Sequence, residues 1–218
     1  MNLLSYDGPV ARFLHLVWDV VLLHLLWLLC SLPLFTIGAA NTALSYACMK
    51  RIRTDEGVLW RNFFSSFRSN FRQATVEWLI LLAVGALLFV DLRIGMAVEG
   101  ALGRVMLIGC SIFLIPYGLV ALYIFPVQAK FENRVADNFK NAFLMSLQSF
   151  VYSLILVLIT GTFVLLTLFF RPFIGLLLCC GAGLYGYLCS AVFVVIFRRY
   201  LPDEAREDQI RSDPNIQD

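Results

Sequence analysis

The first apolar stretch contains ionisable side chains of the kinds that transfer protons in enzymes and transporters. This stretch, residues 13–32, reads FLHLVWDVVLLHLLWLLCSL and contains His15, Asp19 and His24. A histidine beside a carboxyl group can relay protons or act as a general base. His15 and Asp19 are four residues apart and share a helix face, so they can pair. His24 lies about 180° around the helix from His15, so one helix cannot unite the three. We expect an interfacial His–Asp pair and a bundle-facing His24 that donates to a carbonyl, with a proton relay or polar ligand site and a catalytic dyad as alternatives.

A second group of polar side chains lies in the next apolar stretch, residues 33–49, which reads PLFTIGAANTALSYACM. Its small residues allow helices to approach closely, and its hydroxyl and amide groups can hydrogen-bond across them. We therefore expect this segment inside the bundle, away from lipid. Together with the first stretch it offers a candidate intramembrane polar site, formed by His24, Thr36, Asn41, Thr42 and Ser45.

Motifs of catalysis, metal binding or cofactor binding are not found in the chain. It contains no HExxH, GxSxG, P-loop or Rossmann pattern. Its six cysteines lie in apolar runs without CxxC spacing, as expected of packing residues. Glu77, beside Trp78 at the start of a predicted span, is interpreted as a carboxylate that complements the helix dipole. We expect no catalytic residues, no metal, no cofactor and no enzymatic activity.

The composition predicts a membrane protein. Of 218 residues, 60% are hydrophobic and 15% charged, with a mean hydropathy of +0.80, against roughly 45–50% and about 25% in soluble domains. We expect an all-α polytopic protein, a single helical domain over 1–200 followed by a flexible cytoplasmic tail, 201–218. The six predicted spans are 13–32, 33–49, 74–90, 105–125, 147–170 and 173–197. If 33–49 only re-enters the membrane, the alternative is five spans and a re-entrant helix.

The distribution of Lys and Arg predicts the orientation. Fourteen of the 17 lie on one side of the predicted spans, and three, Arg93, Arg104 and Arg171, lie on the other. The side rich in basic residues is cytoplasmic by the positive-inside rule. Both termini are then cytoplasmic if 33–49 crosses fully.

Two cytoplasmic segments are expected to be amphipathic helices. In LWRNFFSSFRSNFRQ, residues 59–73, the aromatic residues follow helical spacing in one stripe, with arginines largely on the other faces. We expect a helix lying in the membrane interface or against the bundle, with a docking helix for another protein as the alternative. A nucleic-acid platform is excluded because it needs a groove in a soluble fold. The predicted interface comprises Trp60, Arg61, Phe63, Phe64, Phe67, Arg68, Phe71, Arg72, Phe139 and Phe143.

A weak internal repeat favours six spans. Asn62, Phe63 and Phe67 match Asn138, Phe139 and Phe143 at an offset of 76 residues. Each unit then comprises a helix that enters the cytoplasm, a charged turn, an amphipathic segment and a helix that leaves. Parallel repeats of this kind occur in transport proteins.

Part of the sequence resembles a known family. The residues LHLLWLLCSLPLFTIGAANTAL (23–44), the charged RTDEG (53–57) and RNFFSSFRSNFRQAT (61–75) are similar to the YesL-like family of bacterial integral membrane proteins, domain of unknown function 624. The run PLFTIG, Pro33 to Gly38, is the most specific element. At the position of His24 the family usually has Asn, which weakens the idea of fixed chemistry there.

The resemblance implies a multi-pass protein of the bacterial plasma membrane. Such proteins are often encoded beside carbohydrate ABC importers and sensor kinases, so we expect an accessory or regulatory partner of an importer or its sensor. The alternative is a small solute or ion transporter or channel, with a hydrated path lined by the candidate polar site.

Overall fold

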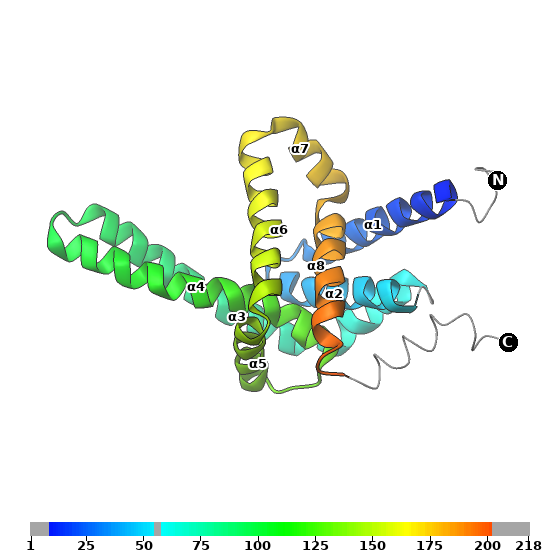
Figure 1. Ribbon diagram of the computed structural model, residues 1–218, viewed down its shortest axis with the longest axis horizontal. Coiled ribbons are helices and arrows are strands. Elements are labelled where there is room, and N and C mark those ends of the chain that lie inside the picture. Colours follow the sequence, from blue (N-terminus) through cyan, green and yellow to red (C-terminus); the bar gives the residue numbers. More distant parts are fainter. Residues whose placement is uncertain (1–8, 55–57, 202–218) are drawn as a thin grey trace.

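The computed structural model describes residues 9–54 and 58–201, and all regular elements within these ranges are helices (Figure 1). They are α1 (Pro9–Ser31), the 3-10 helix η1 (Leu34–Thr36), α2 (Ile37–Thr54), α3 (Leu59–Ala97), α4 (Ala101–Lys130), α5 (Val135–Gln148), α6 (Phe150–Phe169), α7 (Arg171–Leu176), the π-helical turn η2 (Leu177–Gly181) and α8 (Ala182–Phe197). The predicted all-α class is confirmed. The predicted tail, 201–218, lies outside the described residues except for its first residue.

Within the described residues, five helical segments are long and apolar enough to cross a membrane: Leu14–Ser31, Leu59–Ala97, Ala101–Lys130, Phe150–Phe169 and Cys179–Phe197. Large apolar side chains on these segments point away from the protein; Phe113 and Phe169, for example, are 66% and 82% exposed. So much apolar surface requires an apolar surrounding, and the chain is therefore a multi-pass membrane protein. The predicted span 33–49 is not one of the five, since α2, with which it overlaps, also carries Lys50, Arg51 and Arg53.

Helix α2 forms the centre of the fold. It packs against α1, α3, α4 and α8, and its residues Ala39, Ala40, Ala43 and Ala47 are at most 1% exposed. A side chain at Gly38 would collide with the backbone carbonyl of Ala74 in α3. Small residues therefore let the α2 backbone approach its neighbours closely, as the sequence indicates for a helix inside the protein.

Helices α1 and α2 are antiparallel. The indole Nε1 of Trp27 donates to Oδ1 of Asn41 at 2.7 Å, and further along the pair Arg51 Nε donates to the Asp19 carboxylate at 2.7 Å. Moving back along α1 from Trp27 to Asp19 thus means moving forward along α2 from Asn41 to Arg51. The chain therefore returns along α2 toward the side from which α1 starts, and Arg51 lies at the level of Asp19.

The first predicted amphipathic helix is not a separate element. The structure joins 59–73 and the predicted span 74–90 into α3, a single helix of 39 residues. The reason is local, because no Gly or Pro occurs between Val58 and Gly85 to end a helix. The second amphipathic segment is a helix of its own, α5, which Ser149 separates from α6. The two units of the predicted repeat therefore differ in construction.

The apolar helices form diverging hairpins rather than one parallel bundle. In Figure 1 the α3–α4 hairpin extends to the left, and the hairpin of α6 with α7 and α8 extends to the top. Both start from the region around α2, where the buried aromatic rings of Tyr123 and Phe193 meet edge to face at 5.0 Å. The close approach of α8 to α1 requires Gly183, since a Cβ there would collide with the Val20 carbonyl.

Candidate functional site

His24 satisfies the backbone at a break in the last span. It is 3% exposed, and its Nδ1 accepts a hydrogen bond from the backbone N–H of Ala182 at 3.1 Å. Ala182 is the first residue of α8, directly after the π-helical turn η2, where the regular i to i−4 bonding changes. Within a bilayer such an N–H group must find a partner inside the protein. His24 thus faces the interior as expected, and the bond described is one that its ring nitrogen accepts from a backbone N–H. The expected donation to a carbonyl stays a prediction.

The other four residues of the predicted polar site use their polar groups in different places. The hydroxyl of Thr36 lies 2.5 Å from the Cys30 carbonyl of α1 and 2.6 Å from that of Pro33, and the hydroxyl of Thr42 donates to the Gly38 carbonyl of its own helix at 3.0 Å. Asn41 accepts from the indole of α1, as described above, and Ser45 is half-buried on α2. Asp19, predicted to pair with His15, has an ion pair with Arg51.

Two hollows divide the predicted polar site between them. A hollow of about 550 Å³ between α1, α2, α6 and α8 has mainly apolar walls and includes His24 and Asn41. A second hollow of about 220 Å³, between α2, α3, α4, α6 and α8, includes Asn41 and Ser45. Asn41 therefore shares one hollow with His24 and the other with Ser45. A hydrated path lined by all five residues stays a prediction.

An extended polar cluster surrounds Glu77, which is fully buried. Asn138 of α5 donates through Nδ2 to both carboxyl oxygens of Glu77, at 3.0 and 3.1 Å. Gln73, one turn earlier on α3, donates to Oε1 of Glu77 at 3.1 Å and to Oε1 of Gln128 at 2.8 Å. Gln128 in turn donates to Asn70 at 3.1 Å. This amide–carboxyl network joins α3, α4 and α5.

Around the NH₂ groups of Gln73 and Asn138, oxygen acceptors outnumber the protons that these two groups carry. The two NH₂ groups of Gln73 and Asn138 carry four protons, and five oxygen atoms lie within hydrogen-bonding distance of them. The Oδ1 atom of Asn138 is a further buried acceptor, and it has no hydrogen-bond partner among the described residues. A hollow of about 620 Å³ with mainly polar walls, reached by Gln73 and Gln128, opens beside it.

The sequence alone does not reveal this network, because the position of Glu77 at the start of a predicted span indicates only a complement to the helix dipole. One signal was present: Gln73 and Glu77 are four residues apart and share a helix face. Gln128 and Asn138 could not be added from spacing, since they lie on α4 and α5, and only the packing of these helices brings them to Glu77.

The predicted aromatic stripe is divided between the protein and its surface. Phe63 is fully buried against α1 and α2, and Phe67 and Phe71 are half-buried, with their rings 5.4 Å apart. Trp60 and Phe64 are 47% and 37% exposed. The remaining members of the predicted interface are the exposed residues Arg61, Arg68, Arg72 and Phe143 and the half-buried Phe139. The guanidinium group of Arg61 lies 5.3 Å from the centre of the Trp60 ring.

Two comparisons with known proteins bear on this chain. The family described as "Protein of unknown function, DUF624" matches residues 20–92. "Uncharacterized protein YesL" of Bacillus subtilis (strain 168) is 25% identical over 197 residues, which cover 88% of this chain and 81% of that protein. No solved structure matches. The family match and the similarity to YesL support a YesL-like DUF624 family and confirm the resemblance found in residues 23–44 and 61–75.

The bond between His24 and Ala182 leads to a first prediction. His24→Leu leaves the Ala182 N–H without a partner and should destabilise the protein by about 1–3 kcal/mol. His24→Asn keeps an acceptor oxygen at the position and should retain most of the stability. Thermal unfolding of the purified protein in detergent measures both. Equal losses for the two variants would show that the acceptor at this position does not matter.

The network around Glu77 leads to a second prediction. Glu77→Met and Asn138→Leu each leave a buried polar partner unsatisfied, and each should cost about 1–3 kcal/mol. The double variant should cost clearly less than the sum, because it removes both partners. Lys140→Ala, on the exposed side of α5, serves as the control and should change stability by less than about 0.5 kcal/mol. Additive losses in thermal unfolding would contradict a direct coupling of the two residues.

Proposed function

We propose that this YesL-like membrane protein is a non-enzymatic accessory protein that docks a partner protein at its cytoplasmic end. The proposal rests on the exposed face of the first half of α3, which we term the α3 face: Trp60, Arg61, Phe64, Arg68 and Arg72. Aromatic residues and arginine are the types enriched in protein interfaces and at their energetic centres.

The division of the aromatic stripe favours a protein partner over lipid at this face. A helix lying on a membrane turns its continuous apolar stripe toward the acyl chains. Here the centre of the stripe, at Phe63, is already packed against α1 and α2. The two exposed aromatic residues, Trp60 and Phe64, stand among arginines in a shallow surface hollow that also includes Ser65 and Ser69.

We infer that α2 is a sixth crossing, shielded from lipid by protein. Because α1 and α2 are antiparallel, the chain returns after α2 to the side from which α1 starts. The excess of basic residues on that side makes it cytoplasmic. The α3 face, α5 and both termini then lie on the cytoplasmic side of a bacterial plasma membrane.

The resemblance to the YesL-like family indicates which partners to test first. That family's association with carbohydrate ABC importers and sensor kinases makes an importer subunit or its sensor the proposed partner. The function would be regulatory, through binding. The described part of the chain contains no group of three or more potential metal ligands, and the proposal requires no cofactor.

Site-specific crosslinking tests docking directly. A photoreactive residue at Phe64 in living cells should capture a defined protein, and an importer subunit or sensor kinase is the expected product. The same residue at Phe89, which is 62% exposed on the α3–α4 hairpin, is the control and should not capture it. Trp60→Ala together with Arg61→Ala should reduce the yield severalfold. Capture of lipid alone at Phe64 would contradict the proposal.

Cysteine labelling tests the proposed orientation. A membrane-impermeant maleimide added to intact cells should label Glu99→Cys, in the turn between α3 and α4, and should label Arg61→Cys only after lysis. The parent chain with its six cysteines gives the background. An N-terminal tag should be protected from external protease. A tag cleaved in intact cells would instead favour five crossings with α2 re-entrant.

A further inference from the structure

The exposed residues between Leu59 and Gln73 form two parallel rows along α3. In each row the residues are four apart: Trp60, Phe64, Arg68 and Arg72 in the first, and Arg61, Ser65 and Ser69 in the second. Residues four apart lie on the same side of a helix, about 6 Å from each other along its axis. The two rows together therefore form a continuous surface about 18 Å long.

The two rows differ in the size of their side chains. The first contains large residues throughout, whereas the second contains two small ones, Ser65 and Ser69. Both serines line a shallow hollow of about 750 Å³ beside Trp60 and Phe64, and the hydroxyl of Ser69 donates back to the Ser66 carbonyl of its own helix at 3.1 Å. We term this depression the serine groove. A groove along an i, i+4 row is the kind of surface into which a second helix packs a ridge of side chains.

The arginines of the α3 face have no acidic partner in the described part of the chain. Within residues 9–54 and 58–201 no carboxylate forms an ion pair with Arg61, Arg68 or Arg72. Arg61 contacts the ring of Trp60, as described above. An interface that covers this surface would take the guanidinium groups out of water, and a charge buried without an opposite charge is costly.

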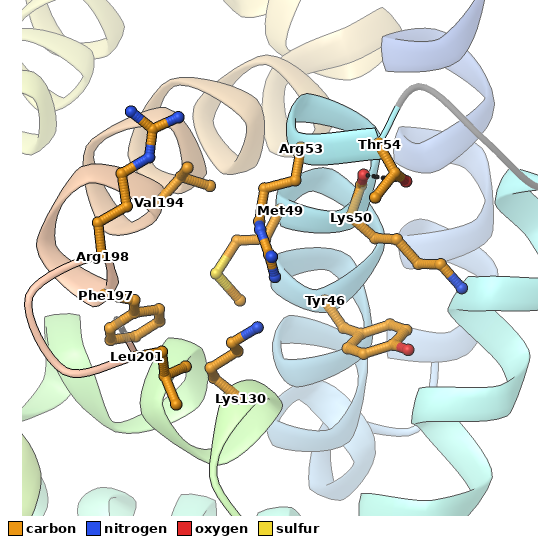
Figure 2. Close-up of a pocket in the computed structure, with 10 residues that line it drawn as sticks. All are labelled: Tyr46, Met49, Lys50, Arg53, Thr54, Lys130, Val194, Phe197, Arg198 and Leu201. Carbon is orange, nitrogen blue, oxygen red and sulfur yellow. Dashed lines mark hydrogen bonds between the residues drawn. The ribbon is translucent and has the colours of Figure 1, made fainter. Parts of the chain in front are cut away.

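The basic residues at the ends of α2, α4 and α8 differ in this respect. Figure 2 shows them around a hollow of about 260 Å³: Lys50, Arg53, Lys130 and Arg198. Lys50 donates to Oδ1 of Asn62 at 3.0 Å, and the other three each have an interaction with the chain. The arginines of the α3 face are therefore the better candidates for pairing with groups of another molecule.

We propose that the partner docks on the α3 face through an amphipathic α-helix that carries acidic residues, an inference that rests on the proposed function and names the kind of segment that binds. Its carboxylates pair with Arg68 and Arg72, since a guanidinium group binds a carboxylate through two parallel hydrogen bonds. Its small or apolar side chains enter the serine groove and contact Trp60 and Phe64.

An α-helix suits this surface better than an extended segment. A helix satisfies its own backbone groups, whereas an extended segment that lies on the side chains of α3 would leave backbone N–H and C=O groups without partners. Acidic residues four apart on a helix repeat about every 6 Å, which is the interval between Arg68 and Arg72 along α3.

Crosslink mapping in living cells tests the chemistry of the docked segment. A photoreactive residue in place of Ser69 should capture the same protein as one in place of Phe64, and the captured peptide should contain acidic residues three or four apart. A basic or neutral peptide would overturn the inference while the proposed docking function stands. Capture of lipid alone at both positions would overturn both. Capture of residues 55–57 or 202–218, which are acidic segments of this chain outside the described residues, would make the chain itself the occupant and overturn the inference.

Charge-matched variants measure the role of the arginines. Arg68→Glu together with Arg72→Glu should lower the yield of captured protein at Phe64 by about tenfold or more, because like charges then face each other. Lys140→Glu together with Arg199→Glu makes the same change of charge at exposed positions elsewhere and should leave the yield within about twofold. Equal losses in the two variants would show unspecific attraction and contradict the pairing. If the glutamate variant does not accumulate, Arg68→Gln together with Arg72→Gln should lower the yield by about threefold, and an unchanged yield would contradict the pairing.

Filling the serine groove tests the helix packing without a change of charge. Ser65→Leu together with Ser69→Leu should lower the yield at Phe64 severalfold, because the ridge of the partner helix then no longer fits. Ser65→Ala together with Ser69→Ala keeps the groove open and should retain the yield. An unchanged yield in the leucine variant would contradict packing in this groove.

Discussion

Close backbone packing around α2 is the constraint on which the rest of the structure depends. Glycine and alanine on this helix allow α1, α3, α4 and α8 to meet around it, and at Gly38 no larger residue fits against α3. In a bilayer the surrounding lipid is as apolar as the helices, so association relies on such packing and on hydrogen bonds between helices. The hairpins can diverge because each is fixed at its base to this centre, while their outer parts are surrounded by lipid.

Polar groups inside the protein form hydrogen bonds with backbone groups or with partner side chains. His24 satisfies the N–H group at the π-helical break, and Asn41 accepts from the indole of Trp27. A larger polar cluster surrounds Glu77, whose carboxyl group accepts from amides of α3 and α5, and Gln128 of α4 accepts from the same two amides. Removing one partner from such a network is costly in a low dielectric, so this cluster sets how firmly α3, α4 and α5 are held together.

The helical class, the membrane location and the interior position of α2 could be predicted, because hydropathy and small-residue content are local properties of the chain. Helix boundaries were less predictable: polarity changes near residue 74, but nothing in 59–84 ends a helix, so α3 continues. The network could not be predicted because Glu77 and Asn138 are 61 residues apart and meet only through tertiary packing. The same holds for the hollow of Arg53 and Lys130, where separate helix ends converge.

The continuity of α3 has a mechanical consequence. At 1.5 Å per residue its 39 residues span about 58 Å, roughly twice the hydrocarbon thickness of a bilayer. An unbroken helix transmits a tilt from one end to the other without the loss that a loop would introduce. A force that a bound protein exerts on Trp60 would therefore also displace the opposite end of α3, near Gly95. The fixed point of this movement would be near Ala74, where Gly38 of α2 packs closely against α3.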